Sequence, residues 1–589
     1  MIDEALSDGR LSSMKRALAE IRERSRNAPS FRLSIARTFT LETQADALAF
    51  ALALIPCSPE VFIGDYGVLE PLLFDPSSAI FASDPSAVLV LWRLQDLHPD
   101  LCAAPNALTG AQRERAFEEV RDRIEALTAG FRNASSAPLF LSTFPPVDPV
   151  TLSDLTAGFG LGEIVARLNA AILALAARSS NVYVFDFAAW AARAGSASFD
   201  RKLDLFARQP IAASALKSFA FAVARTLRPL LVAPRKVLVL DLDNVLWGGI
   251  LGEDGIDGLQ IGHDFPGSVY RRIQLLALDL KARGVLLALV SKNNPADVTE
   301  AFAARPDMPL ELGDFSAIRI NWEAKSLNLR SIAAELNLGV DALAFVDDQA
   351  FELEEVRHEL PEVALIEGGR DPLGILRALE ETPLFDALRL SETDRVRSQD
   401  YAAQRQRAAL EVRAPNLEDF LHSLELHASI EPVDERSFER AAQLIAKTNQ
   451  FNVTTRRHGP GDLRRLLDEP GTTALTLSLR DRFGDQGIVG LAIAIRGDAA
   501  GERRLDTFLL SCRALGRGAE RALWARLLDE LARAGATVLR AEYLATAKNA
   551  QVEDLFDRFG MRQTEASEMR RRYVLALPAA FEAPQWIAT

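Results

Sequence analysis

The chain has 589 residues, of which 48% are hydrophobic and 25% charged, which predicts a globular protein of several domains because single cores stop growing near about 250–300 residues. Its net charge of −14 argues against a nucleic-acid polyanion as the main partner. The three cysteines form no disulfide or zinc pattern and no run of about eighteen uncharged apolar residues occurs, so we expect no membrane span and a reducing, cytoplasmic location.

The N-terminal part of the chain is predicted to be an α/β unit. Its first 30 residues alternate charged residues with Leu and Ala, as in an amphipathic helix and unlike a signal peptide. Strand-like runs then alternate with helical stretches such as Gln112–Leu127 and Leu161–Ala177. The predicted strands are Phe31–Ile35, Glu60–Ile63, Ala87–Trp92, Pro138–Ser142 and Val182–Phe187.

This N-terminal unit offers little for catalysis. Arg37–Thr40 supplies no clear serine nucleophile, and the only histidine, His98, lies in a polar loop. Because a Ser-His-Asp hydrolase needs a base within reach of its nucleophile, we expect the unit to serve in substrate or carrier docking.

The next element is an apolar run, Lys236–Leu240, that ends in Asp241 and Asp243. A parallel strand buried on both faces has this pattern, and open α/β sheets place their ligands at its carboxyl end. Two carboxylates there can hold a divalent cation and divide nucleophilic attack and proton transfer between them. The alternative for this pair is a simple turn at the end of a strand.

Three further landmarks follow in chain order. Arg283–Val290 is an apolar run that ends in the hydroxyl of Ser291, Lys325 precedes an amphipathic stretch, and Ala342–Val346 ends in Asp347 and Asp348. Carboxylates, hydroxyl, lysine and carboxylates in this order, with helical sequence between them, are typical of phosphoryl transfer on a doubly wound sheet.

Each landmark also has a structural alternative. Ser291 could cap the helix that follows Asn294, since serine is a favoured N-cap. Lys325 could be a solvated surface lysine. One of Asp347 and Asp348 could cap the helix that begins near Ala350 instead of binding metal.

The spacing also predicts an open site. Between Asp241 and Ser291 lie only the glycine-rich stretch Gly248–Gly267 and one helical segment, Ser268–Arg283, which is too little for a separate capping domain. A large substrate, such as a carrier protein with a phosphopantetheine arm, could therefore reach the site, unless neighbouring domains cover it.

The C-terminal part begins after a charged, helix-forming arm, Ser391–Leu424. A strand, Arg504–Cys512, leads through a glycine loop, Arg513–Gly518, to an amphipathic helix, Ala519–Ala534. Glycines that open a helix expose backbone N–H groups to a phosphate. Gly518 could also serve only to ease the start of the helix.

Taken together, these motifs resemble the haloacid-dehalogenase-like phosphohydrolase superfamily. Leu-Asp-Leu-Asp-Asn-x-Leu-Trp-Gly-Gly, Ser-Lys-Asn-Asn and Val-Asp-Asp are similar to its FkbH-like, subclass IIIC branch, and the likeness extends into Thr448–Arg457, Asp481–Gly487 and Ser511–Gly518. It implies a three-domain α/β protein. Its parts are an N-terminal domain similar to serine-glycine-asparagine-histidine (SGNH) hydrolases (1–232), a Rossmannoid parallel sheet without a large cap (233–382), a helical linker (383–430) and an α+β domain similar to GNAT-type N-acetyltransferases (431–589).

The resemblance also implies roles for single residues. Asp241 would be the nucleophile that forms an aspartyl-phosphate, and Asp243 would protonate the leaving oxygen and then deprotonate the attacking water. Ser291 and Lys325 would hold the phosphoryl oxygens, where a fixed donor and a cation stabilise the transition state. The metal would be Mg²⁺, which prefers oxygen ligands, held by Asp241, Asp243 and Asp347 with Asp348 beside it.

In the third domain, Arg-x-x-Gly-x-Gly is similar to the GNAT pyrophosphate loop, and Asn549–Gly560 resembles the later asparagine and helix motif. The resemblance implies that Arg513, Gly516, Gly518 and Asn549 bind a pantetheine-type ligand.

The family implies a reaction in which an acyl group, typically glyceryl from bisphosphoglycerate, is loaded on an acyl carrier protein with loss of phosphate for polyketide-type biosynthesis. Many relatives carry Cys just before Ser-Lys-Asn-Asn, but this chain has Val290, which cannot form a thioester. Cys512 is the remaining thiol near a motif, or a small buried strand residue. The rival hypotheses are a plain small-metabolite phosphatase with a scaffolding third domain, and a non-catalytic docking protein of an assembly line.

Overall fold

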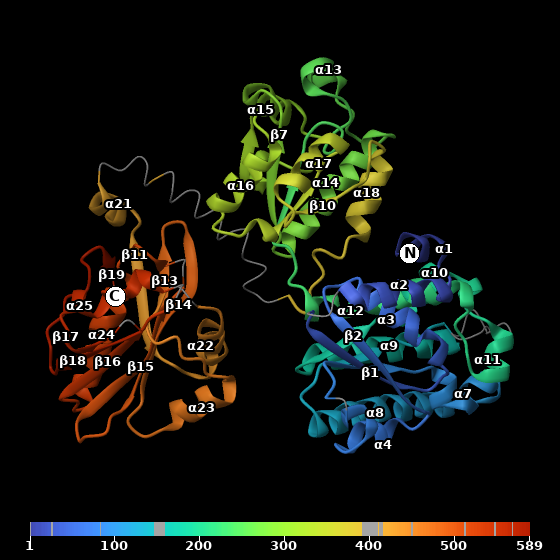
Figure 1. Cartoon of the computed structure of the whole chain (residues 1–589), viewed down its shortest axis with the longest axis horizontal. Helices are drawn as coiled ribbons and strands as arrows, with labels where there is room; N and C mark the ends of the chain where they lie inside the picture. The colour runs from blue at the N-terminus through green and yellow to red at the C-terminus, as the bar shows by residue number, and fades with distance from the viewer. Residues whose placement is uncertain are drawn as a thin grey trace.

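The computed structural model describes residues 2–24, 28–82, 84–146, 160–390, 410, 416–448, 451–511, 514–546, 549–567 and 569–588. Its strands form three separate sheets that follow one another along the chain (Figure 1). The first two sheets are parallel and the third is mixed. Among the described residues, no helix is both long and apolar enough to span a bilayer.

The first sheet has five parallel strands in the order β2-β1-β3-β4-β5. The central strands β3 and β4 are apolar and buried on both faces, as is typical of a parallel sheet, whereas β2 at the edge is partly exposed. The strands are β1 (Ser30–Arg37), β2 (Ser58–Tyr66), β3 (Ala87–Leu91), β4 (Leu139–Ser142) and β5 (Val182–Phe185). The helices are α1 (Ile2–Asp8), α2 (Leu11–Arg24), α3 (Ala45–Ala53), α4 (Leu69–Phe74), α5 (Ala79–Ala82), α6 (Leu94–Leu97), α7 (Pro99–Ala103), α8 (Gly110–Ala134), α9 (Leu161–Arg178), α10 (Phe187–Ala194), α11 (Arg201–Ala207) and α12 (Leu216–Leu231).

The second sheet also has five parallel strands, in the order β10-β9-β6-β7-β8. Hydrophobic clusters cover both of its faces, so the three central strands β9, β6 and β7 are fully buried and the carboxyl edge of the sheet is left for polar residues. The strands are β6 (Val237–Leu240), β7 (Leu286–Ser291), β8 (Phe315–Ile320), β9 (Leu343–Val346) and β10 (Ala364–Ile366). The helices are α13 (Leu251–Gly258), α14 (Gly267–Ala282), α15 (Pro295–Ala304), α16 (Lys325–Glu335), α17 (Ala350–Glu359) and α18 (Pro372–Glu381).

The third sheet has nine strands in the order β17-β18-β16-β15-β14-β13-β11-β19, with β12 paired to β15. Helix α24 packs on one face within the largest hydrophobic cluster, and α22 and α23 pack within the cluster on the other face. The strands are β11 (Leu426–Pro432), β12 (Phe451–Asn452), β13 (Thr473–Asp481), β14 (Gly484–Arg496), β15 (Glu502–Leu510), β16 (Val538–Leu544), β17 (Arg562–Ala566), β18 (Arg570–Ala576) and β19 (Ile587–Ala588). The helices are α21 (Leu417–Ser423), α22 (Glu435–Lys447), α23 (Pro460–Asp468), α24 (Ala519–Arg533) and α25 (Leu555–Arg558).

The predicted linker 383–430 is shorter than the sequence suggests. Residues from Leu417 onward belong to the third unit, because Phe420 and Leu424 pack in its core and β11 is one of its strands. At the other end, Phe385 packs in the core of the second unit and Leu388 against that of the first. Most of the predicted arm between them lies outside the described residues.

Candidate active site

The site is built where three neighbouring strands of the second sheet end. Leu240, the last residue of β6, is paired with Val346 at the end of β9, so Asp241 and Asp347 follow these strands side by side. The backbone N–H of Asp241 donates to the Val346 carbonyl at 3.1 Å. Ser291 ends β7 on the other side of β6. The predicted order of strand ends therefore brings these residues together at one edge.

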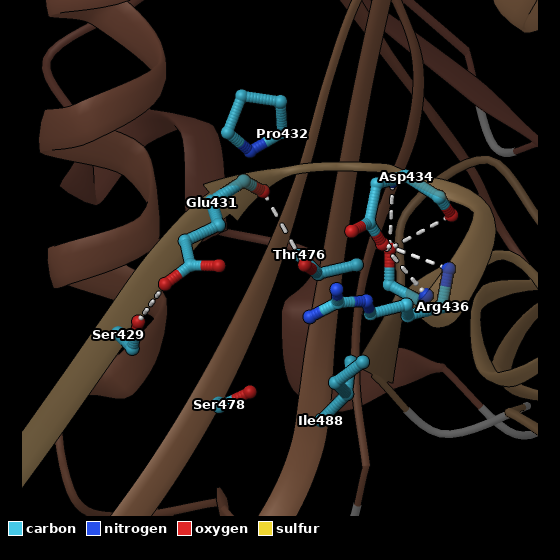
Figure 2. A pocket seen from close by; sticks show the side chains of 9 residues that line it. Ser429, Glu431, Pro432, Asp434, Arg436, Thr476, Ser478 and Ile488 are labelled. Atoms are coloured by element: carbon cyan, nitrogen blue, oxygen red, sulfur yellow. Dashed lines mark hydrogen bonds between the residues drawn. The ribbon is translucent and has the colours of Figure 1, made fainter.

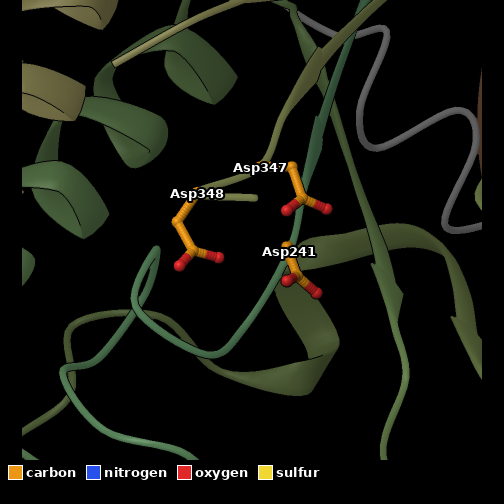
Figure 3. A group of neighbouring side chains, drawn as sticks. All are labelled: Asp241, Asp347 and Asp348. Atoms are coloured by element: carbon orange, nitrogen blue, oxygen red, sulfur yellow. The ribbon is translucent and has the colours of Figure 1, made fainter. Parts of the chain in front are cut away.

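Three carboxylates converge at this edge (Figure 3). Asp241, Asp347 and Asp348 each offer a carboxylate oxygen, and these oxygens lie within 4.8 Å of one another. All three residues are buried, and the Asp347 side chain is fully covered. Within the described residues this is the cluster of His, Cys, Asp and Glu side chains that could hold a metal ion.

A buried lysine balances part of this negative charge. Lys325, the first residue of α16, is only 2% exposed. Its Nζ donates to Asp241 Oδ1 at 2.8 Å and to the Val290 carbonyl at 2.9 Å, and lies 3.2 Å from Asp347 Oδ2. Burial alone would lower the pKa of Lys325, but the two carboxylates raise it, so the ammonium stays charged. The alternative of a solvated surface lysine is thereby rejected.

One ammonium does not satisfy three buried carboxylates. Burial and the charge of Asp241 raise the pKa of Asp347 to about 7, although Lys325 opposes the shift. The same two causes raise the pKa of Asp348. Asp348 Oδ1 is buried without a hydrogen-bond partner, and the buried Asp347 Oδ2 has no partner other than the Lys325 ammonium. Unsatisfied oxygens in an oxygen-only cluster fit a hard divalent cation such as Mg²⁺.

Asp243 does not join this cluster, contrary to the prediction that its carboxylate helps to hold the metal. Its Oδ1 accepts hydrogen bonds from the Trp247 indole N–H at 3.0 Å and the Leu251 backbone N–H at 3.1 Å. Its Oδ2 accepts from Asn293 Nδ2 at 2.8 Å. Three N–H donors therefore orient the half-buried carboxylate.

Ser291 is part of the site and does not cap a helix. Its side chain is buried, and its Oγ accepts from Asn293 Nδ2 at 3.1 Å. The following helix, α15, is capped by Asn294, whose side chain accepts from the Ala296 N–H. Asn293 thus connects Ser291 to Asp243, a link that the sequence did not reveal even though Asn293 lies within the Ser-Lys-Asn-Asn motif.

The helix cap proposed for Asp347 or Asp348 is also absent. Helix α17 begins at Ala350 without a side-chain cap, and Asp347 Oδ1 instead accepts from the Gln349 N–H at 2.9 Å. Two glutamates of α17 contact neighbouring segments of the site: Glu352 pairs with Lys292 after β7, and Glu355 accepts from the hydroxyl and N–H of Ser326 in α16. Helical spacing alone gave no sign of these contacts.

Val290 lies away from the site. Its side chain is fully buried in the hydrophobic cluster between the sheet and helices α16 and α17, together with Leu329 and Val356. Only its carbonyl reaches the site, through Lys325. Strand alternation explains this, because adjacent residues of β7 point to opposite faces.

Only some of the residues predicted to bind pantetheine in the third unit are among the described residues. Cys512 and Arg513 lie outside the described residues. Gly516 and Gly518 both have left-handed φ values, +75° and +81°, and Gly518 is the N-cap residue directly before α24. Both glycines are therefore needed by the backbone itself, whether or not a ligand binds the loop.

Asn549 has a structural role in the described chain, which differs from the prediction of a ligand-binding side chain. It is fully buried. Its Nδ2 donates to the carbonyls of Asn452 and Leu544, both at 2.9 Å, and its Oδ1 accepts from the Thr546 N–H and the Tyr543 hydroxyl. The Asn549 side-chain amide therefore connects β12 and β16 through hydrogen bonds.

The first unit has a buried polar network at the carboxyl edge of its sheet. Arg93 is 2% exposed and pairs with Asp96 and Asp204, while Thr38 donates to Asp96 at 2.8 Å. His98 is used elsewhere, because its Nδ1 accepts from the N–H of Leu101 at the start of α7.

Two hollows lie outside the carboxylate cluster. A pocket of about 230 Å³ in the third unit has a polar lining, which includes Asp434, Arg436 and Ser429 with its hydrogen bond to Glu431 (Figure 2). A groove of about 1820 Å³ runs along β5, the edge strand of the first sheet, and is closed by α12 and residues 380–390. Neither hollow contains a cluster of potential metal ligands among the described residues.

The chain is similar in fold to the N-terminal part of a Bacteroides fragilis protein, which contains a phosphatase domain and was solved in complex with Mg. The alignment covers 64% of this chain and 99% of the other at 23% identity, with a TM-score of 0.57. Two N-acetyltransferases are also similar to part of the chain. The ribosomal-protein-S18-alanine N-acetyltransferase of Escherichia coli has 17% identity over 26% of this chain and 97% of the other, with a TM-score of 0.21. The spermidine N-acetyltransferase of Vibrio cholerae has 11% identity over 25% of this chain and 95% of the other, with a TM-score of 0.20. No protein-family model and no curated protein matches the sequence.

Proposed function

We propose that the chain is a Mg²⁺-dependent phosphohydrolase of the haloacid-dehalogenase type, FkbH-like class. The observation that carries this proposal is the buried convergence of Asp241, Asp347 and Asp348 around Lys325, at the carboxyl edge of a parallel sheet. The fold likeness to a phosphatase domain solved with Mg supports it.

In this proposal Asp241 attacks the phosphorus atom and carries the phosphoryl group as an aspartyl-phosphate. Lys325 fixes the attacking carboxylate by its 2.8 Å hydrogen bond. Ser291 supplies a hydroxyl to the phosphoryl oxygens. A divalent cation held by Asp241, Asp347 and Asp348 would offset the carboxylate charge that otherwise repels an anionic substrate.

Asp243 would move the proton. It lies two residues after the nucleophile and is oriented by Trp247, Leu251 and Asn293. It would protonate the leaving oxygen in the first half of the reaction and deprotonate the attacking water in the second.

We further propose that the substrate is an acyl or glyceryl phosphate and that an acyl carrier protein accepts the acyl group, as in polyketide-type pathways. Three exposed apolar side chains on segments that carry site residues support a protein partner: Trp322, Leu327 and Phe351 are 75%, 51% and 76% exposed. Each lies within three residues of Lys325 or Asp348 in the sequence. Exposed apolar side chains beside functional residues are typical of docking surfaces.

A plain small-metabolite phosphatase is the second candidate. It is favoured by the engagement of Asn549 with protein groups and by the position of Val290 in the core, since neither offers a contact to an acyl chain. In that case the third unit would be a scaffold.

One experiment separates these candidates. The chain is incubated with bisphosphorylated glycerate, Mg²⁺ and a holo-carrier protein, and both phosphate release and the mass of the carrier are measured. A mass gain with phosphate release supports the acyl-loading enzyme, and phosphate without mass gain supports the plain phosphatase. If neither phosphate nor a mass gain is observed, both enzymatic candidates are rejected and a docking protein remains.

A further inference from the structure

A second constellation of reactive side chains lies in the third unit, centred on Asp506 of β15. The neighbouring β14 residues Ile493 and Ala494 pair with Thr507 and Leu505, so Asp506 is an extra residue that forms a β-bulge. Bulges re-aim side chains and are over-represented beside active sites. The bulge places this carboxylate against the segment that follows β12.

Asp506 is a buried carboxylate with a histidine at hydrogen-bond distance. It is 4% exposed, and its Oδ2 lies 2.7 Å from His458 Nε2 and 2.9 Å from the Thr507 hydroxyl. Its Oδ1 accepts from Arg456 at 2.8 Å. Burial raises the pKa of Asp506, but these hydrogen bonds outweigh it and hold the pKa below its ordinary value.

The tautomer of His458 follows from these partners. An ionised carboxylate only accepts hydrogen bonds, so His458 Nε2 must carry the proton that it donates to Asp506. In neutral His458 the unprotonated nitrogen is therefore Nδ1. The side chain is 18% exposed, so the ring is not sealed in the core. A histidine oriented by a buried carboxylate is the arrangement of a general base.

The backbone beside this pair is strained. Thr455 has a left-handed φ of +51°, which is an outlier for a β-branched residue. The strain is held by hydrogen bonds from the Thr455 N–H to Asn452 Oδ1 and from the Thr454 hydroxyl to the Asp506 carbonyl, at 2.9 and 2.7 Å. Such outliers cluster at functional sites. The strained turn delivers Arg456 and His458 to the bulge.

We propose that His458 and Asp506 form an acid–base dyad that transfers an acyl group between thiols. The acceptor gives its S–H proton to His458 Nδ1, and its sulfur forms a new bond to the carbonyl carbon of an acyl thioester. The C–S bond of the donor then breaks, and the departing thiolate takes the proton from His458. The choice of an acyl thioester rests on the proposed function. Imidazoles and thiols ordinarily titrate within about two pH units of each other, which makes this proton transfer easy.

The test is a thiol exchange assay that uses no phosphate ester. The full chain is mixed with the acetyl thioester of N-acetylcysteamine and a second small thiol, and exchange is followed by mass spectrometry. We expect His458→Asn to lower the exchange rate at least about 100-fold. His427→Asn, which alters an exposed histidine of β11, is the matched control and should exchange at the wild-type rate. A His458→Asn variant that exchanges at the wild-type rate, or a wild-type chain that gives no catalysed exchange, would overturn the dyad.

A second measurement, of the tautomer of His458, can be made on the wild-type chain. Nitrogen-15 spectra of histidine-labelled wild-type chain should show His458 protonated at Nε2, and a proton on Nδ1 alone would also overturn the proposal. In Asp506→Asn, Arg456 should bind the oxygen of the new side-chain amide, which leaves the amide N–H facing His458. The proton of neutral His458 should then move from Nε2 to Nδ1, and the rate of thiol exchange should fall. Because phosphate release is measured separately, failure of the proposed phosphatase and failure of the dyad give different results.

Discussion

Replacement of Lys325 by methionine should destabilise the second unit strongly. Met matches the length of the side chain but removes the ammonium that lies 2.8 Å from Asp241 and 3.2 Å from Asp347. Breaking a buried ion pair on one side costs about 3–5 kcal/mol, because the remaining charge is left uncompensated. Proton uptake by Asp347, whose pKa is already about 7, should reduce this cost in acid. The loss in the free energy of unfolding should therefore be larger at pH 8 than at pH 6.

Urea unfolding of metal-free protein measures this loss. Lys281→Met is the matched control, because Lys281 forms a more exposed pair with Asp314 in the same unit and should cost about 0–1 kcal/mol. Mg²⁺ at about 100 times its dissociation constant should restore about 2.7 kcal/mol to any variant that still binds it. Equal stability of the two variants would refute the view that Lys325 compensates the buried carboxylates.

Three further predictions concern the same site. The pKa of Asp347 is about 7 in the folded chain and lies near 3.8 in the unfolded chain, so between these values the folded chain binds one more proton. The free energy of unfolding of the metal-free protein should therefore fall by up to about 4 kcal/mol as the pH rises from about 4 to 7. Asp347→Asn should flatten this pH profile in urea titrations, and an unchanged profile would contradict the assignment. Asn293→Ala should lower kcat for phosphate release about 10- to 100-fold by freeing Asp243, and an unchanged kcat would show that the link is not needed. Trp322→Ala should raise KM for a carrier-bound phosphate without changing KM for a small phosphate ester, and equal effects on both would argue against a docking surface.

Much of the fold was predictable because the parallel strands are buried on both faces. Apolar runs such as that ending at Leu240 mark these strands without ambiguity, and the predicted β7 and β9 are confirmed. Strands β8 and β10 were not predicted, since β8 is half-buried toward its end and carries Arg319, and β10 has only three residues. The start of the third unit was misplaced because Leu417–Ser423 is charged on its outer face and its contribution to the core is visible only in three dimensions.

The site was predictable to the extent that strand ends meet at one edge. Asp241, Ser291 and Asp347 follow from that rule alone. The direction of Asp243 did not follow, because it depends on a turn that brings the Trp247 indole back to the carboxylate. Asn293 was missed for a similar reason, since its amide is placed by the loop after β7 and not by a periodic pattern.

Phosphate release offers a simple check on the nucleophile. Asp241→Asn keeps the shape of the side chain but removes its nucleophilic charge, so Mg²⁺-dependent release should be lost while Asp341→Asn, at an exposed position of the same unit, retains it. Undiminished release by Asp241→Asn would remove Asp241 from the reaction.

Anomalous scattering from crystals soaked in Mn²⁺ tests the central claim most directly. The account predicts one strong peak within coordination distance of the carboxylates of Asp241, Asp347 and Asp348. A crystal whose metal peaks all lie elsewhere, with these three side chains bound only to protein and water, would contradict it.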